Sequence, residues 1–229
     1  MGLKPKRKSI ESWNFMIIKP AKIKKTTTKI DDLITHISPS KLERMRHVLA
    51  QRTRHVTLVT EEMHYPYNAS AVIRSAECFG IQDIHIVQKR NAFCAYTGIA
   101  RGSHKWTTLN YYRSTQDCYA HLKEKGYRIV ATSPHAQATL PRDISLDTKI
   151  ALVFGNEAVG LSPEALAMAD EFIAIPMLGF TESLNVSVCV SICLYDVMQK
   201  LRTGSVAWQL SGTEQEQLLA YWVRIAIDK

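Results

Sequence analysis

Apolar residues recur along this chain in two alternating patterns, which predict strands and helices in turn. Short apolar runs predict strands at residues 56–60, 83–87, 128–133, 150–154 and 172–176. Amphipathic runs predict helices at residues 69–79, 115–125, 184–201 and 213–227, and another that begins at Ser162 and Pro163. Strands that alternate with helices in this way predict an α/β fold, in which helices cover both faces of a parallel sheet.

A further amphipathic helix is predicted before the first strand. Ser40 is its expected N-cap, and apolar residues follow at spacings of three and four over residues 42–49. At the other end of the chain, Thr213 and Glu216 have the spacing of a capping box that would begin the last helix.

The positive charge of the chain is concentrated at its N-terminus. The 29 Lys and Arg residues exceed the 21 Asp and Glu residues by 8, and residues 1–30 alone hold nine bases and one acid. We expect residues 1–36 to form a disordered basic tail, which either is only solvated or helps to hold a polyanion. Residues 37–202 would then form the α/β domain with its basic N-terminal helix, and residues 203–229 a C-terminal helical extension.

The composition excludes several classes of protein. The chain is 46% apolar and 22% charged, which is typical of a folded domain and not of a disordered chain. No run approaches about 18 apolar residues, so we expect no membrane span. The five cysteines form no C-x-x-C pair, so neither a disulfide framework nor a metal site is expected. These features are typical of a protein of the reducing cytoplasm.

A glycine-containing loop follows the predicted strand at residues 150–154. Its sequence, GNEAVGLS at residues 155–162, differs by one residue from a phosphate-binding loop, which needs Lys where this chain has Leu161. Glu157 would also place an anion in the phosphate cradle, so a nucleoside triphosphate is disfavoured. A ligand without phosphates would tolerate Glu157 at this edge of the sheet. The alternative is that the glycines only form a tight turn and that Glu157 stabilises a helix dipole.

Three sequence blocks place polar residues where predicted strands end or predicted helices begin. They are residues 68–80 (NASAVIRSAECFG), 154–162 (FGNEAVGLS) and 175–187 (IPMLGFTESLNVS). Taken one at a time, each block is explained by helix capping or by a solvated arginine. Taken together and in this order, they closely resemble the SpoU/TrmH branch of the SPOUT methyltransferases, and the resemblance runs from about residue 42 to residue 201.

The resemblance implies a fold, a cofactor and a set of site residues. The C-terminal part of the α/β domain would be tied in a trefoil knot, and the protein would act as a homodimer with its active site near the subunit interface. S-adenosylmethionine would be bound by Thr132, Gly155, Ile175 and Leu184. The catalytic residues would be Arg74, Asn68, Glu157, Ser183 and Asn185.

The implied reaction is methyl transfer from S-adenosylmethionine to a ribose 2′-hydroxyl of RNA. Within this branch, the chain looks most like the enzymes that methylate guanosine 18 in the D-loop of tRNA, so tRNA is the expected partner. Methylation of rRNA or of another tRNA site, and RNA binding without catalysis, are the alternatives. A guanidinium is a poor base because its pKa exceeds about 12, so we expect Arg74 to clamp a phosphate and to stabilise the developing alkoxide.

Basic residues outside the three blocks are the candidate RNA contacts. They lie on or just after the N-terminal helix and in an acid-free predicted loop, and they are Arg44, Arg46, Arg52, Arg54, Arg101 and Lys105. Phosphate contacts of this kind position RNA without reading its sequence. One departure from the family pattern, Glu182 before Ser183, brings an acid close to the site and leaves the identity of the substrate open.

Overall fold

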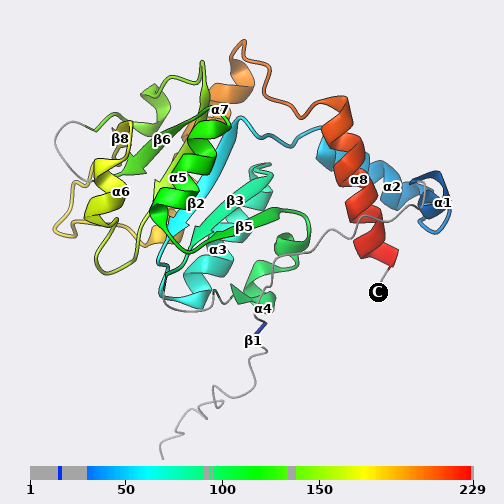
Figure 1. Ribbon diagram of the computed structural model, residues 1–229, viewed down its shortest axis with the longest axis horizontal. Coiled ribbons are helices and arrows are strands. Elements are labelled where there is room, and N and C mark those ends of the chain that lie inside the picture. The colour runs from blue at the N-terminus through cyan, green and yellow to red at the C-terminus, as the bar shows by residue number, and fades with distance from the viewer. Residues whose placement is uncertain (1–14, 17–29, 90–92, 94, 134–137, 228–229) are drawn as a thin grey trace, which may run out of the picture.

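The computed structural model describes residues 15–16, 30–89, 93, 95–133 and 138–227 (Figure 1). Its centre is a sheet of six parallel strands in the order β5-β3-β2-β7-β6-β8. In chain order the strands of this sheet are β2 (Val56–Glu61), β3 (Asp83–Val87), β5 (Thr108–Tyr112), β6 (Tyr127–Thr132), β7 (Lys149–Phe154) and β8 (Glu171–Ile173). The central pair, β2 and β7, joins segments that are distant in the sequence.

Helices cover both faces of the sheet. One face carries α3 (Pro66–Cys78) and α7 (Val186–Thr203), and the other carries α5 (Thr115–Glu124) and α6 (Pro163–Ala167). Alternate residues of each strand enter the two cores. Leu152 and Phe154 of β7 pack with α3 and α7, whereas Ala151 and Val153 pack with α5 and α6. The predicted α/β fold with a two-sided parallel sheet is therefore confirmed.

Helices from the two ends of the described chain form a second, smaller core. These helices are α1 (Ile30–Ile34), α2 (Pro39–Leu49) and α8 (Gly212–Ile227). Leu49 of α2 and Trp222 and Val223 of α8 are its most deeply buried side chains. Figure 1 shows the three helices together at one end of the molecule, away from α5 and α6.

The N-terminal region is more structured than the sequence pattern predicts. Ile30–Ile34 form α1, and β1 (Phe15–Met16) pairs antiparallel with β4 (Ala95–Tyr96). The predicted disorder over residues 1–36 is wrong for these residues, because packing against distant segments leaves no local signal. The other residues of that stretch up to residue 29 lie outside the described residues.

The predicted acid-free loop at residues 89–105 also contains regular structure. Besides β4, it includes α4 (Thr97–Ala100) and the 3-10 helix η2 (Ser103–Lys105). The strand β5, which follows this loop, is absent from the sequence prediction. Its five residues are all only half-buried, because β5 lies at the edge of the sheet, and they lack the apolar run that marks the inner strands.

Two helix starts differ from the predicted ones. The N-cap of α2 is Ser38 and not Ser40. At α8 the capping box is formed by Ser211 and Glu214: the Glu214 N–H donates to Ser211 Oγ at 3.3 Å, and the Ser211 N–H donates to Glu214 Oε2 at 2.9 Å. The predicted capping box of Thr213 and Glu216 is therefore wrong by two residues.

Candidate functional site

The three sequence blocks meet at the carboxyl ends of the strands. The first block forms most of α3, the second leaves β7, and the third leads from β8 into α7. Parallel strands place their carboxyl ends at one edge of the sheet, which is where ligands bind in folds of this class. The fold thus joins side chains that are up to 117 positions apart in the chain.

A chain of hydrogen bonds connects one polar residue from each block. Asn68 Nδ2 donates to Glu157 Oε1 at 2.8 Å, and Asn185 Nδ2 donates to Asn68 Oδ1 at 3.1 Å. Asn185 Oδ1 accepts from the Ser187 N–H at 2.9 Å, so Asn185 is also the N-cap of α7. The sequence offered helix capping as the alternative explanation for Asn185. The structure shows that Asn185 both caps α7 and takes part in the network.

Glu157 is held in its charged form. The backbone N–H groups of His64 and Tyr65, just before α3, donate to its two carboxylate oxygens at 2.9 and 3.2 Å. Burial alone would raise the pKa of Glu157, but these donors and Asn68 together lower it below its ordinary value. The carboxylate is consequently a poor proton acceptor at neutral pH. It is suited to orienting its neighbours and to attracting a cation.

The loop after β7 depends on its glycines. Asn156 and Gly160 exchange two backbone hydrogen bonds, at 3.0 and 2.9 Å, and Gly160 has a φ of 71°. A Cβ atom at Gly155 would lie only 2.3 Å from the carbonyl carbon of Gly160, so a larger residue would displace the loop. The glycines therefore do form a tight turn. That turn carries Glu157 to the N-terminus of α3, whose dipole favours a negative charge.

A cavity of about 390 Å³ lies beside this network, and we call it the motif cavity. Its lining includes Asn68, Thr132, Gly155, Glu157, Ser183, Leu184 and Asn185. A smaller cavity of about 150 Å³ shares Thr132, Ser183 and Leu184 with it and is also lined by Ile175 and Glu182. The structure thus gathers every predicted catalytic and cofactor-binding residue except Arg74 around two adjoining cavities.

The lining of these two cavities is compatible with a sulfonium compound. It contains two carboxylates, Glu157 and Glu182, and the described lining residues include no Lys or Arg. The cavities therefore attract a cation and repel a phosphate. A ligand can approach the main chain closely at Gly155, and the motif cavity, at about 390 Å³, lies within the range of about 300–1,000 Å³ that small-molecule sites occupy. The donor set suits S-adenosylmethionine better than a nucleoside triphosphate.

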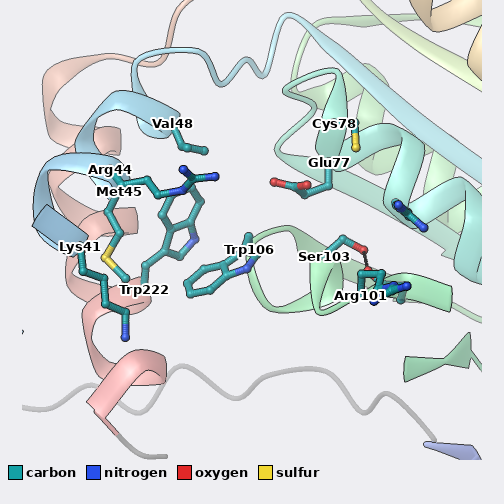
Figure 2. A pocket seen from close by; sticks show the side chains of 12 residues that line it. Lys41, Arg44, Met45, Val48, Glu77, Cys78, Arg101, Ser103, Trp106 and Trp222 are labelled. Atoms are coloured by element: carbon teal, nitrogen blue, oxygen red, sulfur yellow. Dashed lines mark hydrogen bonds between the residues drawn. The ribbon is translucent and has the colours of Figure 1, made fainter. Parts of the chain in front are cut away.

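Arg74 faces a different cavity. It lies on α3, about one and two-thirds turns beyond Asn68, and lines a space of about 420 Å³ that we call the arginine cleft. Figure 2 shows this cleft between α2 and α8 on one side and α3 and the α4–η2 segment on the other. Within one chain, the predicted catalytic arginine and the predicted cofactor-binding residues are therefore separated.

Four of the six candidate RNA contacts have side chains that solvent can reach without breaking an ion pair. Arg44 and Arg101 are exposed and line the arginine cleft. Arg46 is exposed on α2, and Lys105 is half-buried at the end of η2, and neither of them lines the cleft. These four residues stay candidates for contact with RNA.

The prediction that Arg52 contacts RNA is wrong. Its side chain is 1% exposed, and its guanidinium donates to Glu77 Oε1 and, at 3.1 Å, to the carbonyl oxygen of Ile81. The guanidinium carbon also lies 5.4 Å from the centre of the Trp222 ring. Burial lowers the pKa of Arg52, and the charge of Glu77 opposes this shift. Arg52 therefore connects α3 to α8 inside the protein.

Arg54 is also engaged in contacts within the protein, which would compete with its predicted contact with RNA. Its Nε donates to Asp83 Oδ2 at 2.9 Å, and its Nη1 donates to Glu214 Oε1 at 2.8 Å. A phosphate would have to compete with two carboxylates for this guanidinium. The partners lie 29 and 160 residues away along the chain, so local sequence could not reveal them. Arg54 ties α8 to the sheet.

Some residues of the site were missed by sequence reasoning. Glu61 is 2% exposed and accepts hydrogen bonds from the N–H and the hydroxyl of Ser162, at 2.8 and 2.7 Å, and so fixes the far end of the second block. The sequence signal that could have identified Glu61 is a carboxylate at the end of the otherwise uncharged strand β2. Trp106 and Trp222, which line the arginine cleft, are too far apart in the sequence to be recognised as neighbours.

Two further findings concern the described ranges as a whole. No helix within them is both long and apolar enough to cross a membrane. No group of three or more His, Cys, Asp or Glu side chains within them is arranged so that it could hold a metal ion. Cys193, one turn beyond Cys189 on α7, is a free thiol buried in the core.

Comparison with known proteins identifies relatives over most of the chain. The model of the SpoU rRNA Methylase family matches residues 55–195. The tRNA (guanosine(18)-2′-O)-methyltransferase of Borreliella burgdorferi is 36% identical over 196 residues, which cover 86% of this chain and 90% of that relative. The enzyme of the same name from Thermus thermophilus is 34% identical over 183 residues, which cover 79% of this chain and 94% of that relative.

A solved structure has the same fold. It is described as an A. aeolicus TrmH/SpoU tRNA modifying enzyme, and it matches with a TM-score of 0.75 and 30% sequence identity over 83% of this chain and 98% of that one. The family match spans more than half of the present sequence and includes all three blocks that surround the motif cavity. This chain therefore belongs to the SpoU rRNA Methylase family.

Proposed function

We propose that this chain is an S-adenosylmethionine-dependent methyltransferase that modifies a ribose 2′-hydroxyl of tRNA, at guanosine 18 in the D-loop. The observation that carries the proposal is the bonded network of Asn68, Glu157 and Asn185 beside an acidic cavity. The helix that carries Asn68 also carries Arg74, which enters a basic cleft. An acidic cavity suits a cationic methyl donor, and a basic cleft suits RNA. The relatives named for guanosine 18 support the choice of nucleotide.

On the donor side, the chain holds and orients the cofactor. S-adenosylmethionine supplies an electrophilic methyl group on a positively charged sulfur when it is bound. Gly155, Ile175 and Leu184 would hold it mainly through the main chain. The same applies to Thr132, because its hydroxyl already donates to the Val153 carbonyl at 2.9 Å. Glu157 would stabilise the positive charge, and Ser183 would shape the space where donor and ribose meet.

On the acceptor side, Arg74 binds the substrate and does not remove its proton. A guanidinium carries hydrogen-bond donors and no acceptor, so Arg74 donates hydrogen bonds to a phosphate and to the 2′-oxygen. Negative charge develops on that oxygen as its proton leaves, and Arg74 would stabilise this charge until the oxygen–methyl bond forms and the methyl–sulfur bond breaks. The proton of the hydroxyl leaves to a phosphate oxygen of the RNA or to solvent. Alignment of the oxygen with the methyl group is the main task of the remaining residues.

We further propose that the enzyme is a homodimer in which Arg74 serves the motif cavity of the partner. An apolar face of α7 and the residues before it is exposed, formed by Leu184, Val188, Ile192 and Tyr195. Leu184 also lines the motif cavity, so the cavity opens beside this face. Arg74 adjoins Ser75, whose hydroxyl lies 2.9 Å from that of Ser191 on α7. Pairing of two copies through α7 would cover the apolar face. It would also bring Arg74 of one copy to the motif cavity of the other.

The trefoil knot and the cytoplasmic location are also proposals. Strand β6 lies between β7 and β8, so the chain passes across β6 on its way from Phe154 to Glu171. Such a crossing supports a knotted path, and a crystal structure that traces the whole chain tests it. A tRNA substrate supports the cytoplasmic location, and fluorescence microscopy of a tagged chain tests that.

Methyl transfer to defined tRNA transcripts tests the main proposal. The purified protein is incubated with methyl-labelled S-adenosylmethionine and a transcript that carries either guanosine or 2′-deoxyguanosine at position 18. We expect labelling of the first transcript only, with the label on the ribose of that nucleotide. Labelling of rRNA, or of another tRNA nucleotide, would show that the enzyme has a different substrate from the one proposed. Binding of tRNA without any transfer would show that the chain is a non-catalytic relative.

A further inference from the structure

The arginine cleft joins the two parts of the fold. Helices α2 and α8 form one wall, and α3, α4 and η2 form the other. Figure 2 shows the Arg44 guanidinium and the Glu77 carboxylate directed toward each other across the cleft, with the rings of Trp106 and Trp222 close by. The volume of about 420 Å³ is sufficient for a small ligand such as a nucleotide.

Positive charge dominates the lining of the cleft. Lys41, Arg44, Arg74 and Arg101 line it, and the charged side-chain groups of these four form no hydrogen bond or ion pair with the described part of the chain. Arg101 has a φ of 49°, a strained backbone conformation that is found preferentially at ligand sites. Four unpaired cations around one cleft indicate an anionic ligand, and guanidinium groups bind phosphate with particular strength.

Two tryptophans supply an apolar surface and a free donor. Their rings meet edge to face, with centres 5.5 Å apart, and Trp106 is only half-buried, so that part of its ring is open to a stacking base. Trp222 is 2% exposed, and its Nε1–H has no hydrogen-bond partner among the described residues. Buried donors are nearly always paired in native proteins, so this one points to an acceptor on a ligand.

Glu77 is the one carboxylate among the described lining residues. Its Oε1 accepts from Arg52 Nη2, and Oε2 has no protein donor in the described chain. A carboxylate is an acceptor only, so a base that pairs with it must present N–H groups. Guanine presents two adjacent donors, N1–H and the 2-amino group, on one edge. Adenine, cytosine and uracil do not have such a pair.

We propose that the arginine cleft binds a guanine nucleotide of the RNA substrate. The base stacks on Trp106, and Glu77 accepts its N1–H and 2-amino hydrogens. Trp222 Nε1 donates to O6 or N7 of the base, and Arg44 and Arg101 hold the phosphate. This inference rests on the proposed function for the identity of the polymer as RNA, whereas the preference for guanine is a property of the cleft itself.

Indole NMR signals test the base preference without any turnover. The chain has four tryptophans, so a ¹⁵N-labelled sample gives few indole N–H resonances, and Trp222→Phe assigns the critical one. The probes are guanosine, inosine and adenosine 5′-monophosphates. We expect the Trp222 signal to shift with a dissociation constant about tenfold lower for the guanine nucleotide than for the adenine nucleotide. The inosine nucleotide lacks the 2-amino group and should fall between them.

Substitution of Glu77 supplies the decisive comparison. Glu77→Gln keeps an acceptor for Arg52 but places an amide where guanine needs a carboxylate, so the three nucleotides should bind this variant equally. Glu124→Gln, an exposed acid on α5, is the matched control and should retain the preference. Should Trp222→Phe fail to fold, Trp13→Phe, Trp106→Phe and Trp208→Phe assign the other three resonances, and the Trp222 signal follows by elimination.

The outcomes separate this inference from the proposed function. Equal binding of the guanine and adenine nucleotides by the unmodified protein overturns the inference, as does the absence of any indole shift at millimolar nucleotide. Methylation of guanosine 18 in the same preparation would leave the proposed function standing in either case. A guanine preference in a protein that methylates no RNA would support the cleft and reject the function.

Discussion

Asn68 and Glu157 form a 2.8 Å hydrogen bond that joins helix α3 to the loop after β7. The same helix carries Arg74 into the arginine cleft, so this one bond fixes the position of a helix that serves two cavities. Because Glu157 also accepts from the backbone N–H groups of His64 and Tyr65, just before α3, helix and loop are held at three points. Loss of any one of these contacts should alter the chemistry more than the fold.

Replacement of Asn68 by alanine should impair turnover. The loss of a hydrogen bond to a charged group costs about 1.5–3 kcal/mol, which corresponds to a fall in kcat of roughly ten- to hundredfold. The pKa of Glu157 should rise, because one of the donors that lower it is removed. The acid limb of the pH–rate profile should therefore move to higher pH. Asn110→Ala on β5, away from both cavities, is the control, and an unchanged profile in Asn68→Ala would contradict the role of this bond.

Replacement of Arg74 by lysine should abolish most activity and leave the fold intact. Lysine keeps the charge but lacks the planar fork that grips a phosphate and an oxygen together. The Arg74 side chain is exposed and forms no hydrogen bond or ion pair with the described residues, so thermal stability should not change. Turnover with tRNA and the melting temperature are measured side by side, with the exposed Arg142→Lys as the control. Near-normal turnover in Arg74→Lys would exclude a geometric role for the guanidinium.

Mixed dimers should reveal whether Arg74 acts across the interface. Arg74→Ala and Glu157→Ala are each expected to be inactive alone. If each site takes Arg74 from one subunit and Glu157 from the other, a mixed dimer contains one intact site. Random mixing then restores about a quarter of the normal activity, because half of the dimers are mixed and each has one of two sites. No recovery after verified subunit exchange would place both residues in the same chain's site.

The salt dependence of tRNA binding should distinguish free arginines from engaged ones. Each phosphate contact that is removed should lower the slope of log K against log salt by about 1. We expect this change for Arg44→Gln and for Arg101→Gln. Arg54→Gln should leave the slope unchanged and lower the melting temperature, since Arg54 is bound to Asp83 and Glu214. A reduced slope in Arg54→Gln would show that its ion pairs open to admit RNA.

The attachment of α8 should weaken in acid. Burial alone would raise the pKa of Glu214, but hydrogen bonds from Arg54 and Ser211 lower it from 4.5 to about 2. Since the folded-state value is below the unfolded one, Glu214 stabilises the protein above about pH 4.5, and this contribution is lost as the pH falls toward 2. Urea midpoints of Glu214→Gln should therefore be lower than those of the unmodified protein at pH 7 and converge with them near pH 2. Glu216, on the same helix, is exposed, so Glu216→Gln should have the same urea midpoint as the unmodified protein at both pH values.

The sequence was informative where structure is local or repeated. The inner strands β2, β3, β6 and β7 are apolar enough to be recognised from their composition, and the order of strands and helices implied the parallel sheet. Edge strand β5 and the short pairing of β1 with β4 escaped prediction, because half-buried or two-residue segments leave little periodic signal. Resemblance to a family supplied the candidate site, and geometry then grouped most of it around one cavity.

The failures of prediction at the site concern charge. Arg52 and Arg54 follow two exposed arginines and have the same local composition, but their partners Glu77, Asp83 and Glu214 lie far away in the sequence. The sequence alone does not distinguish a basic residue that forms ion pairs inside the protein from a free one, because the acidic partner is distant in the chain. The separation of Arg74 from Glu157 was hidden for the same reason, since motif order carries no information about which cavity a side chain enters.

The pairing of β2 with β7 constrains how the molecule forms during synthesis. Strand β2 begins at Val56, but its partner β7 starts at Lys149. One edge of β2 therefore stays unpaired until the ribosome has added the intervening chain. At about 5–20 residues per second this delay lasts on the order of 5–20 s. Throughout that interval an apolar strand with an unsatisfied edge is available to other nascent chains. Holding chaperones that bind extended apolar segments would thus be needed early, before the sheet closes.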